Sequence, residues 1–412
     1  MATRSEAAMT DDNTDDNAGA TGGVSLQGLL NDWTPEGLSA GDAAALKDFF
    51  CTFYKNAAVE ELYDMPIERL RSVARSFWDF SSDRQGVPSD TVPLVRVFNP
   101  DYEENASHPC TVIEIVSNDM PFLVASMLAE INEREMAISF LAHPVVDVVR
   151  DTAGVRLIEA AEEPWTGRES MIHIEVALIA SEAERQDLKA GLVDILCHIV
   201  LATGDWQEMT ARLHSATTQL EGLTSFLPEA EVGEAAEFLK WLAGDHFLLL
   251  GARDYVIEGN AETGRLVARK GSSLGVLKDP DVMVLRRQSE TSEGLAPFVR
   301  DFLNQPAPIV IAKSNTRSHV HRRAYMDYIG VKTYSDDGVL TGEWRFIGLF
   351  TSSAYNRSAR AIPYVRRKVQ LALDKTGFAA DTHDAKAFLN VIETFPRDEL
   401  FQISTDQLLE TS

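Results

Sequence analysis

The sequence predicts an α+β protein with two sheet-containing domains that are joined by helices. Strand-like runs gather in two separate stretches, residues 94–201 and 246–350. Runs with the helical spacing of apolar residues precede, separate and follow these stretches. The chain of 412 residues is long enough for roughly two to four domains of ordinary size, so each sheet can have its own core.

Two segments precede the first sheet. Residues 1–25 are acidic, small and poor in apolar side chains, which predicts a disordered tail, because such a segment cannot offset the entropy lost on ordering. Residues 26–85 predict helices, followed by a linker rich in Ser, Asp, Gly and Pro at 81–93. The apolar positions with helical spacing are Leu46, Phe49, Phe50 and Phe53, and then Leu70, Val73, Ala74, Phe77 and Trp78.

Residues 92–202 predict one domain with strands and two helices. The predicted elements are strand 94–98, strand Cys110–Ser117 with one buried face, helix 122–135, a strand pair or bent strand at 137–151, strand 155–162, strand 170–180 and helix 181–203. In outline the order is β-α-β-β-α, with one extra strand before it and another within it. This order is typical of a ferredoxin-like two-layer unit.

The rest of the chain predicts a helical connector at 203–244 and a second domain at 245–376. Its strands surround a polar turn at Asn260–Gly264 and a hairpin signal at Asp336-Asp337-Gly338, with a helix at Pro363–Lys375. An antiparallel sheet of the PAS or GAF sensor type fits this order. Residues 377–412 predict a helical segment, in which Ser404 or Thr405 caps a helix that has barely begun at Ser412. We therefore expect the chain to be truncated at the start of a further domain.

Several motifs that are typical of enzymes are not found in the sequence. No two glycines are separated by a single residue, so the dinucleotide fingerprint GxGxxG is absent, as are the P-loop and HExxH. We also predict no nucleophile elbow. The sequence thus predicts neither catalytic nor cofactor-binding residues in this chain.

Cysteine usage and hydropathy indicate the compartment. Cys51, Cys110 and Cys197 are far apart and odd in number, which predicts buried structural thiols in a reducing, cytoplasmic setting. Since neither a CxxC pair nor a His/Cys cluster has metal-ligand spacing, no metal site is predicted. No apolar run reaches the roughly 18–20 residues that a bilayer span requires, so no membrane partner is expected.

A turn before the first predicted helix is a candidate ligand site. Asn118, Asp119 and Pro121 lie between the strand and helix 122–135, with Asp119 as a possible N-cap. Free amides at a helix N-terminus can bind a carboxylate or an amino acid. The alternative is a capped β-to-α turn without a ligand.

A basic segment is the second candidate. The net charge of −25 argues against nucleic acid as a partner, yet Lys and Arg outnumber Asp and Glu by 12 to 5 between Lys313 and Lys375. Cationic side chains beside hydroxyl and amide groups suit a phosphate or carboxylate. The alternatives are a solvated basic face, or one that docks onto acidic regions of the same polypeptide. The cluster consists of Lys313, Arg317, His319, His321, Arg322 and Arg323; no carboxylate close in sequence completes a metal set with its two histidines.

Many separate segments together resemble one family. They are IEIVSNDMPFLVASM, FLAHPVVDVVRD, AAEFLKWLAGDHFLLLGARDY, SSLGVL, IAKSNTRSHVHRRAYMDYIGVKTY, GEWRFIGLFTSSAYNRS and ETFPRDELFQIS. From about residue 26 to the end, the sequence resembles the N-terminal region of bacterial large NAD-dependent glutamate dehydrogenases. The resemblance implies an ACT-like domain at 92–202 and a PAS-like domain at 245–376.

For the complete protein, the resemblance implies oxidation of L-glutamate to 2-oxoglutarate with NAD, by a catalytic domain beyond Ser412. This chain would then be a regulatory and oligomer-building region without a cofactor of its own. Its implied partners are the catalytic domain of the same polypeptide, further copies in a homo-oligomer, and an amino-acid or anionic effector. The alternative is a stand-alone ACT- and PAS-type sensor of small ligands.

The resemblance also bears on the candidate turn. Ligand-binding ACT domains carry an Asp-Arg-Pro-Gly-Leu-like turn, which Asp119, Pro121 and Leu123 match. Met120 and Phe122 stand in place of the Arg and the Gly, and a phenylalanine there would crowd the usual pocket. Association between subunits is therefore a second role for this domain.

Overall fold

A computed structural model describes residues 26–411 apart from 27, 31, 58–61, 63–64, 85–92, 102–108, 159–164, 259–264, 283–306 and 380–381. The predicted tail 1–25, most of the linker 81–93 and the turn Asn260–Gly264 lie outside the described residues. Within the described ranges, no helix is both long enough and apolar enough to cross a membrane.

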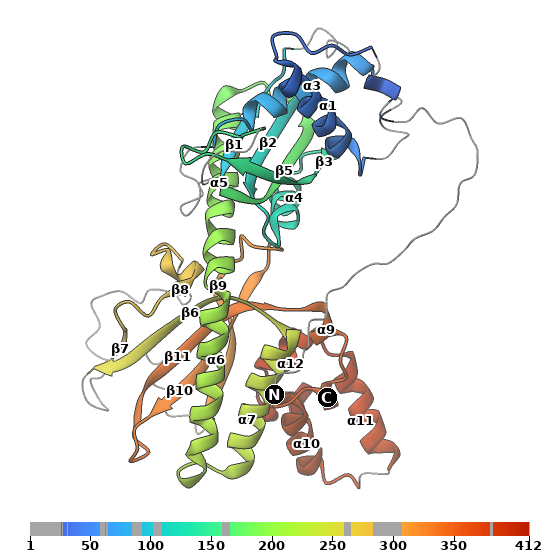
Figure 1. The fold of residues 1–412 in the computed structure, drawn as a ribbon. Coiled ribbons are helices and arrows are strands. Elements are labelled where there is room, and N and C mark those ends of the chain that lie inside the picture. The colour runs from blue at the N-terminus through green and yellow to red at the C-terminus, as the bar shows by residue number, and fades with distance from the viewer. Residues whose placement is uncertain are drawn as a thin grey trace, which may run out of the picture.

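The first unit contains an antiparallel sheet with strand order β1-β2-β5-β3, in which β4 also pairs with β5 (Figure 1). Its strands are β1 (Leu94–Phe98), β2 (Cys110–Asn118), β3 (Ile138–Ala142), β4 (Val145–Arg150) and β5 (Trp165–Ala177). β3 and β4 pair with successive parts of β5, so the predicted strand pair forms one interrupted line with its break at His143-Pro144. β1 takes the edge beside β2, which gives the ferredoxin-like arrangement an N-terminal edge strand.

Helices cover both faces of this sheet. On one face lie α1 (Ala40–Tyr54) and α3 (Ile67–Phe80), whose predicted apolar positions are all buried. On the other face lie α4 (Leu123–Glu133) and α5 (Glu182–Gly204). The unit therefore has three layers instead of the predicted two.

Two strand predictions in this unit are wrong. β2 is buried on both faces, because α1 and α3 cover the face that carries its polar position Glu114, which pairs there with His173 and Arg96. The predicted strand 155–162 is reduced to isolated bridges at Val155 and Arg156, and its last residues lie outside the described ranges.

The second unit contains an antiparallel sheet with strand order β7-β6-β11-β10-β9, in which β8 also pairs with β6. Its strands are β6 (Phe247–Glu258), β7 (Arg265–Ala268), β8 (Leu274–Gly275), β9 (Ile309–Arg317), β10 (Tyr325–Tyr334) and β11 (Leu340–Phe350). The predicted hairpin joins β10 to β11, and Gly338 adopts a φ of 77° there, which favours glycine. The antiparallel sheet is as predicted, whereas its relation to PAS domains stays a prediction.

The predicted connector is part of the second unit. Its helices α6 (Trp206–Glu221) and α7 (Glu229–Trp241) pack on one face of the second sheet and share a core with it. The same core includes the C-terminal helices α10 (Val365–Thr376), α11 (His383–Thr394), α12 (Arg397–Gln402) and α13 (Thr405–Thr411). Short helices lie at α9 (Ser352–Tyr355), η1 (Gly28–Leu30), η3 (Gly222–Ser225), η4 (Leu242–His246), η5 (Val276–Lys278) and η6 (Ala359–Ala361).

Helix α5 connects the two units. It leaves the first sheet and reaches the second, where α6 continues in a similar direction (Figure 1). Apolar residues of α5 such as Leu196 and Ile199 belong to the same buried core as Leu277 and Ile347 of the second unit. The two sheets are thus packed through a shared helix.

Two details of the termini and thiols complete the fold. Ser404 caps α13, because its Oγ accepts a hydrogen bond from the Gln407 amide at 3.2 Å, as predicted.

Cys110 is buried and Cys51 is half-buried, but Cys197 is exposed, so the prediction of three buried thiols is wrong for Cys197.

Candidate functional site

The candidate site is the contact between α4 and residues Arg317–Arg323, which we call the joint. Residues Arg317–Arg323 span the end of β9 and the connection to β10. They cross from the second unit to the first and contact α4 from Ser126 to Glu133. The joint therefore brings together the two segments that the sequence singled out, the candidate turn and the basic cluster.

The turn before α4 is held by contacts within the first unit. Asn118 Oδ1 accepts a hydrogen bond from Arg84 Nη1 at 2.9 Å. The Asp119 amide donates to the Arg168 carbonyl at 3.0 Å, and its carboxylate lies 3.4 Å from the Arg168 guanidinium. Pro121 is exposed in the turn. Binding of a ligand by these residues stays a prediction.

Phe122, and not Asp119, occupies the N-cap position of α4. Its φ of 73° is left-handed, and its side chain makes no capping hydrogen bond. A non-glycine residue in this conformation costs about 1–2 kcal/mol. The chain thus keeps at Phe122 the backbone conformation that a glycine would favour, while the aromatic ring packs edge-on against His321 with ring centroids 5.6 Å apart.

Charge complementarity holds the joint together. Arg323 pairs with Glu130 and, through Nε, with Glu133 at 3.1 Å. Arg317 lies 3.1 Å from Glu133, and Glu130 also accepts a hydrogen bond from Arg134 at 2.8 Å. Burial tends to raise the pKa of Glu130, but the hydrogen bonds from Arg134 and Arg323 outweigh it and lower that pKa. Glu130 is therefore held as an anion.

A hydrogen bond from a backbone amide also connects the two sides of the joint. The His321 amide donates to Ser126 Oγ at 2.8 Å, and that hydroxyl donates to the Phe122 carbonyl at 2.7 Å. Burial, followed by the charge of Arg322, lowers the pKa of His321 and favours its neutral form. The sequence left open whether the basic cluster is a solvated face or docks onto an acidic region of the same polypeptide. Arg317 and Arg323 dock in this way, since both pair with glutamates of α4.

Two members of the predicted cluster make their contacts away from α4: Lys313, which lies outside the joint, and Arg322, which lies within it. Lys313 Nζ is 2.6 Å from Asp327 and 3.3 Å from Asp398 of α12. Arg322 Nη2 donates to the Phe350 carbonyl at 3.0 Å. Burial raises the pKa of Asp327 to about 6 in spite of the Lys313 ammonium. These contacts connect the second sheet to the C-terminal helices, so the structure divides the predicted cluster between two places.

His319 belongs to a group that the sequence analysis missed. Its Nδ1 is 3.1 Å from Asp194 Oδ2, and its ring centroid is 4.9 Å from that of His198. Both partners lie on α5, where the spacing Asp194-x-x-x-His198 places them on one face. That i, i+4 pair was the available signal. No carboxylate close in sequence was expected beside His319 and His321; the one that lies beside His319 is Asp194, which α5 supplies from a distant part of the chain.

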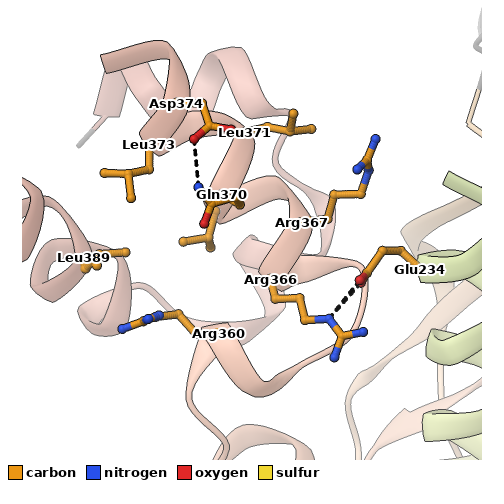
Figure 2. A pocket seen from close by; sticks show the side chains of 10 residues that line it. Glu234, Arg360, Arg366, Arg367, Gln370, Leu371, Leu373, Asp374 and Leu389 are labelled. Atoms are coloured by element: carbon orange, nitrogen blue, oxygen red, sulfur yellow. Dashed lines mark hydrogen bonds and ion pairs between the residues drawn. The ribbon is translucent and has the colours of Figure 1, made fainter. Parts of the chain in front are cut away.

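Apart from the joint, a cavity lies at the C-terminal helices. Figure 2 shows Arg360, Arg366 and Arg367 around this cavity of about 420 Å³ beside α7, α10 and α11. Arg366 Nε lies 2.9 Å from Glu234, and Arg367 lies 2.6 Å from Glu231. Carboxylates therefore neutralise two of the three arginines.

The sequence analysis missed one run with the GxSxG spacing of a nucleophile elbow. Residues Gly271–Gly275 read G-S-S-L-G; the first three follow β7 in a turn, and the last two form the short strand β8. Ser273 Oγ accepts a hydrogen bond from Arg253 Nε at 2.9 Å. An elbow instead places its serine between a strand and a helix, with a histidine as base, so the structure gives this serine no sign of activation.

Comparisons with known proteins identify the family. Residues 49–192 match the model of the glutamate dehydrogenase ACT1 domain, and residues 362–412 match glutamate dehydrogenase helical motif 1. Over these two ranges the chain is similar to glutamate dehydrogenases. The resemblance expected from the sequence is thereby confirmed.

Curated glutamate dehydrogenases match over most of this chain. The NAD-specific glutamate dehydrogenase of Halomonas elongata is 35% identical over 91% of the chain and 23% of its own length. Those of Pseudomonas aeruginosa and Mycobacterium tuberculosis are 32% and 28% identical, over 78% and 72% of the chain. The chain spans about a fifth of the length of these relatives.

The matched ranges contain the α4 side of the joint, whereas Arg317–Arg323 lie between the two ranges. The ACT1 range begins in α1, ends in α5 and contains α4 with its turn. Helical motif 1 contains α10 to α13. The second sheet lies between the two ranges and contacts both, through the joint on one side and through Lys313 and Asp398 on the other.

Proposed function

We propose that this chain is the regulatory and assembly region of an NAD-specific glutamate dehydrogenase. The complete protein would oxidise L-glutamate with NAD and water to 2-oxoglutarate, ammonium and NADH. The observation that carries the proposal is the coverage of the relatives: similarity extends over 91% of this chain but only 23% of the Halomonas elongata enzyme. Most of such a protein is thus available for the nicotinamide and glutamate sites.

The residues of this chain support a role outside the chemical step. Its glycines lack the close spacing that a pyrophosphate needs, so we propose that NAD binds elsewhere in the complete protein. The proposed partners are the catalytic domain of the same polypeptide, further copies in a homo-oligomer and an amino-acid or anionic effector. Placement in the cytoplasm stays a prediction from the sequence.

The joint gives this region a route for coupling. A shift of α4 would act on Arg323 through Glu130, and on the second sheet through the segment that carries Arg323. Arg322 connects the same segment to Phe350, and Lys313 connects β9 to Asp398 of helical motif 1. We therefore propose that the state of the ACT1 domain is passed to the C-terminal helices through the joint.

The test uses the complete enzyme with Arg322→Ala and Arg323→Ala combined. Breaking a largely buried ion pair by removing one partner costs about 3–5 kcal/mol locally, so the joint should loosen. We expect altered activation by effectors or altered subunit assembly, measured by steady-state NADH formation and by light scattering.

The matched control is Lys240→Ala, which lies on α7 away from the joint, is 50% exposed and pairs with the exposed Glu221 and Glu237. Screened surface pairs contribute little, so this variant should behave as the parent enzyme. Unchanged kinetics and unchanged assembly in the double variant, with the fold intact by circular dichroism, would refute a coupling role for the joint.

A further inference from the structure

We propose that Asp194, His198 and His319 bind one divalent transition-metal ion, with Zn²⁺ as the best match, between α5 and the joint. The three side chains come from both units, since His319 follows β9 and the other two lie on α5. They are the one group of at least three potential ligands found among the described residues. This inference is independent of the proposed enzymatic function.

The distances between the potential ligand atoms are close to those between ligand atoms in a zinc site. His319 Nδ1 lies 3.1 Å and His198 Nδ1 lies 3.7 Å from Asp194 Oδ2. In a tetrahedral zinc site with bonds of about 2.0–2.1 Å, neighbouring ligand atoms are about 3.3 Å apart. All three atoms lie within 4.8 Å of one another, so small side-chain rotations would complete the geometry.

His198 is oriented as metal-bound histidines are. Its Nε2 lies 2.9 Å from Asp279 Oδ2, and the Asp279 carboxylate accepts a hydrogen bond from the Asp281 amide at 2.9 Å. A carboxylate that accepts the Nε2 proton fixes the tautomer and leaves the Nδ1 lone pair for a metal. Asp279 would thus orient His198 and raise its basicity.

Burial supplies independent evidence for a ligand. The His198 side chain is only 7% exposed, and its Nδ1 is buried without a hydrogen-bond partner. Leaving a buried polar atom unsatisfied costs about 1–3 kcal/mol, which a coordinated ion would recover. His319 Nδ1 is also buried without a hydrogen bond, although Asp194 is near it.

The surroundings favour a transition metal with an open position. Two imidazoles and one carboxylate suit Zn²⁺ and Co²⁺ better than Mg²⁺ or Ca²⁺, which prefer oxygen ligands. A cavity of about 190 Å³ adjoins the three side chains and leaves room for a water as fourth ligand. The nearby cations Arg317 and Arg323 are paired with Glu133 and Glu130, which limits their repulsion of the ion.

The experiment titrates the chelator-treated chain with ZnCl₂ and CoCl₂ by calorimetry and visible spectroscopy. We expect one ion per chain, a tetrahedral Co²⁺ absorption band and a raised thermal midpoint. Asp194→Asn and His319→Ala, both at partly exposed positions, should weaken Zn²⁺ binding at least ten-fold. Asp279→Asn should weaken it roughly 10- to 100-fold through His198.

Two control variants make the outcome specific. His214→Ala on the exposed side of α6 should leave binding unchanged. Cys197→Ser removes the exposed thiol of α5 and should also leave binding unchanged. Absence of stoichiometric binding, or loss of binding in Cys197→Ser with retention in Asp194→Asn, would overturn the proposed ligand set.

Discussion

At the scale of single residues, Phe122 shows how a family position can change its role. A glycine at this turn would adopt a positive φ without strain, and Phe122 keeps the positive φ. Its ring then contacts His321 of the other unit. A strained turn residue thus makes a contact between the two units.

This account predicts an unusual order of stability for two variants of Phe122. Both Phe122→Gly and Phe122→Ala lose the ring contact with His321, but only alanine keeps a Cβ at a φ of 73°. The glycine variant should therefore be more stable than the alanine variant by about 1 kcal/mol. Urea unfolding followed by circular dichroism measures the difference; an alanine variant as stable as the glycine variant would contradict the strained conformation.

The sequence indicated which residues of the joint carry charge more readily than it indicated which residues they contact. Arg317 and Arg323 stand out in the sequence as cations beside polar groups, and docking within the chain was one of the expected outcomes. Glu130, however, is 193 positions from Arg323, and nothing in the local pattern connects them. Asp194 and His198 had a local signal, the i, i+4 spacing, but their third member comes from His319 on another unit.

At the scale of elements, buried charge between layers explains where the strand prediction failed. Alternation in β2 indicated a solvent-facing side, because Glu114 reads as a surface residue. The structure instead buries it under α3, with His173 Nδ1 at 3.0 Å and Arg96 of β1 as partners. The sequence pattern shows which side chains are polar. Whether a polar side chain is exposed to solvent depends on the helices that cover the sheet.

The same network predicts a pH dependence of stability. His173 of β5 is buried between Glu114 and Glu175, and Arg69 of α3 and Arg96 of β1 pair with those glutamates. Burial alone would lower the pKa of His173, but hydrogen bonds and charge from Glu114 and Glu175 outweigh it and raise that pKa. Because the folded-state pKa exceeds the unfolded value of about 6.5, the stabilisation is fully present below that value and is lost as the pH rises through the folded pKa.

The measurement compares unfolding free energies of the parent chain and His173→Gln at about pH 6 and about pH 9. The excess stability of the parent chain should be larger at the lower pH and should shrink at the higher one. An excess that stays constant or grows with pH would show that His173 is neutral in the folded protein.

At the scale of the whole molecule, α5 and the joint make two sheet units into one body. The helical periodicity of α5, α6 and α7 was visible in the sequence, as was the change from one strand-rich stretch to the next. Their packing was not, since α6 and α7 lie against the second sheet instead of between domains. Which sheet a helix covers depends on contacts between residues far apart in the chain.

The central proposal is that this region controls and assembles a glutamate dehydrogenase without carrying out its chemistry. The most direct measurement is NADH formation from glutamate and NAD by the 412-residue chain, beside the complete protein under the same conditions. We predict no turnover by a chain that circular dichroism shows to be folded, and clear turnover by the complete protein. Sustained NADH formation by the 412-residue chain alone would contradict the account.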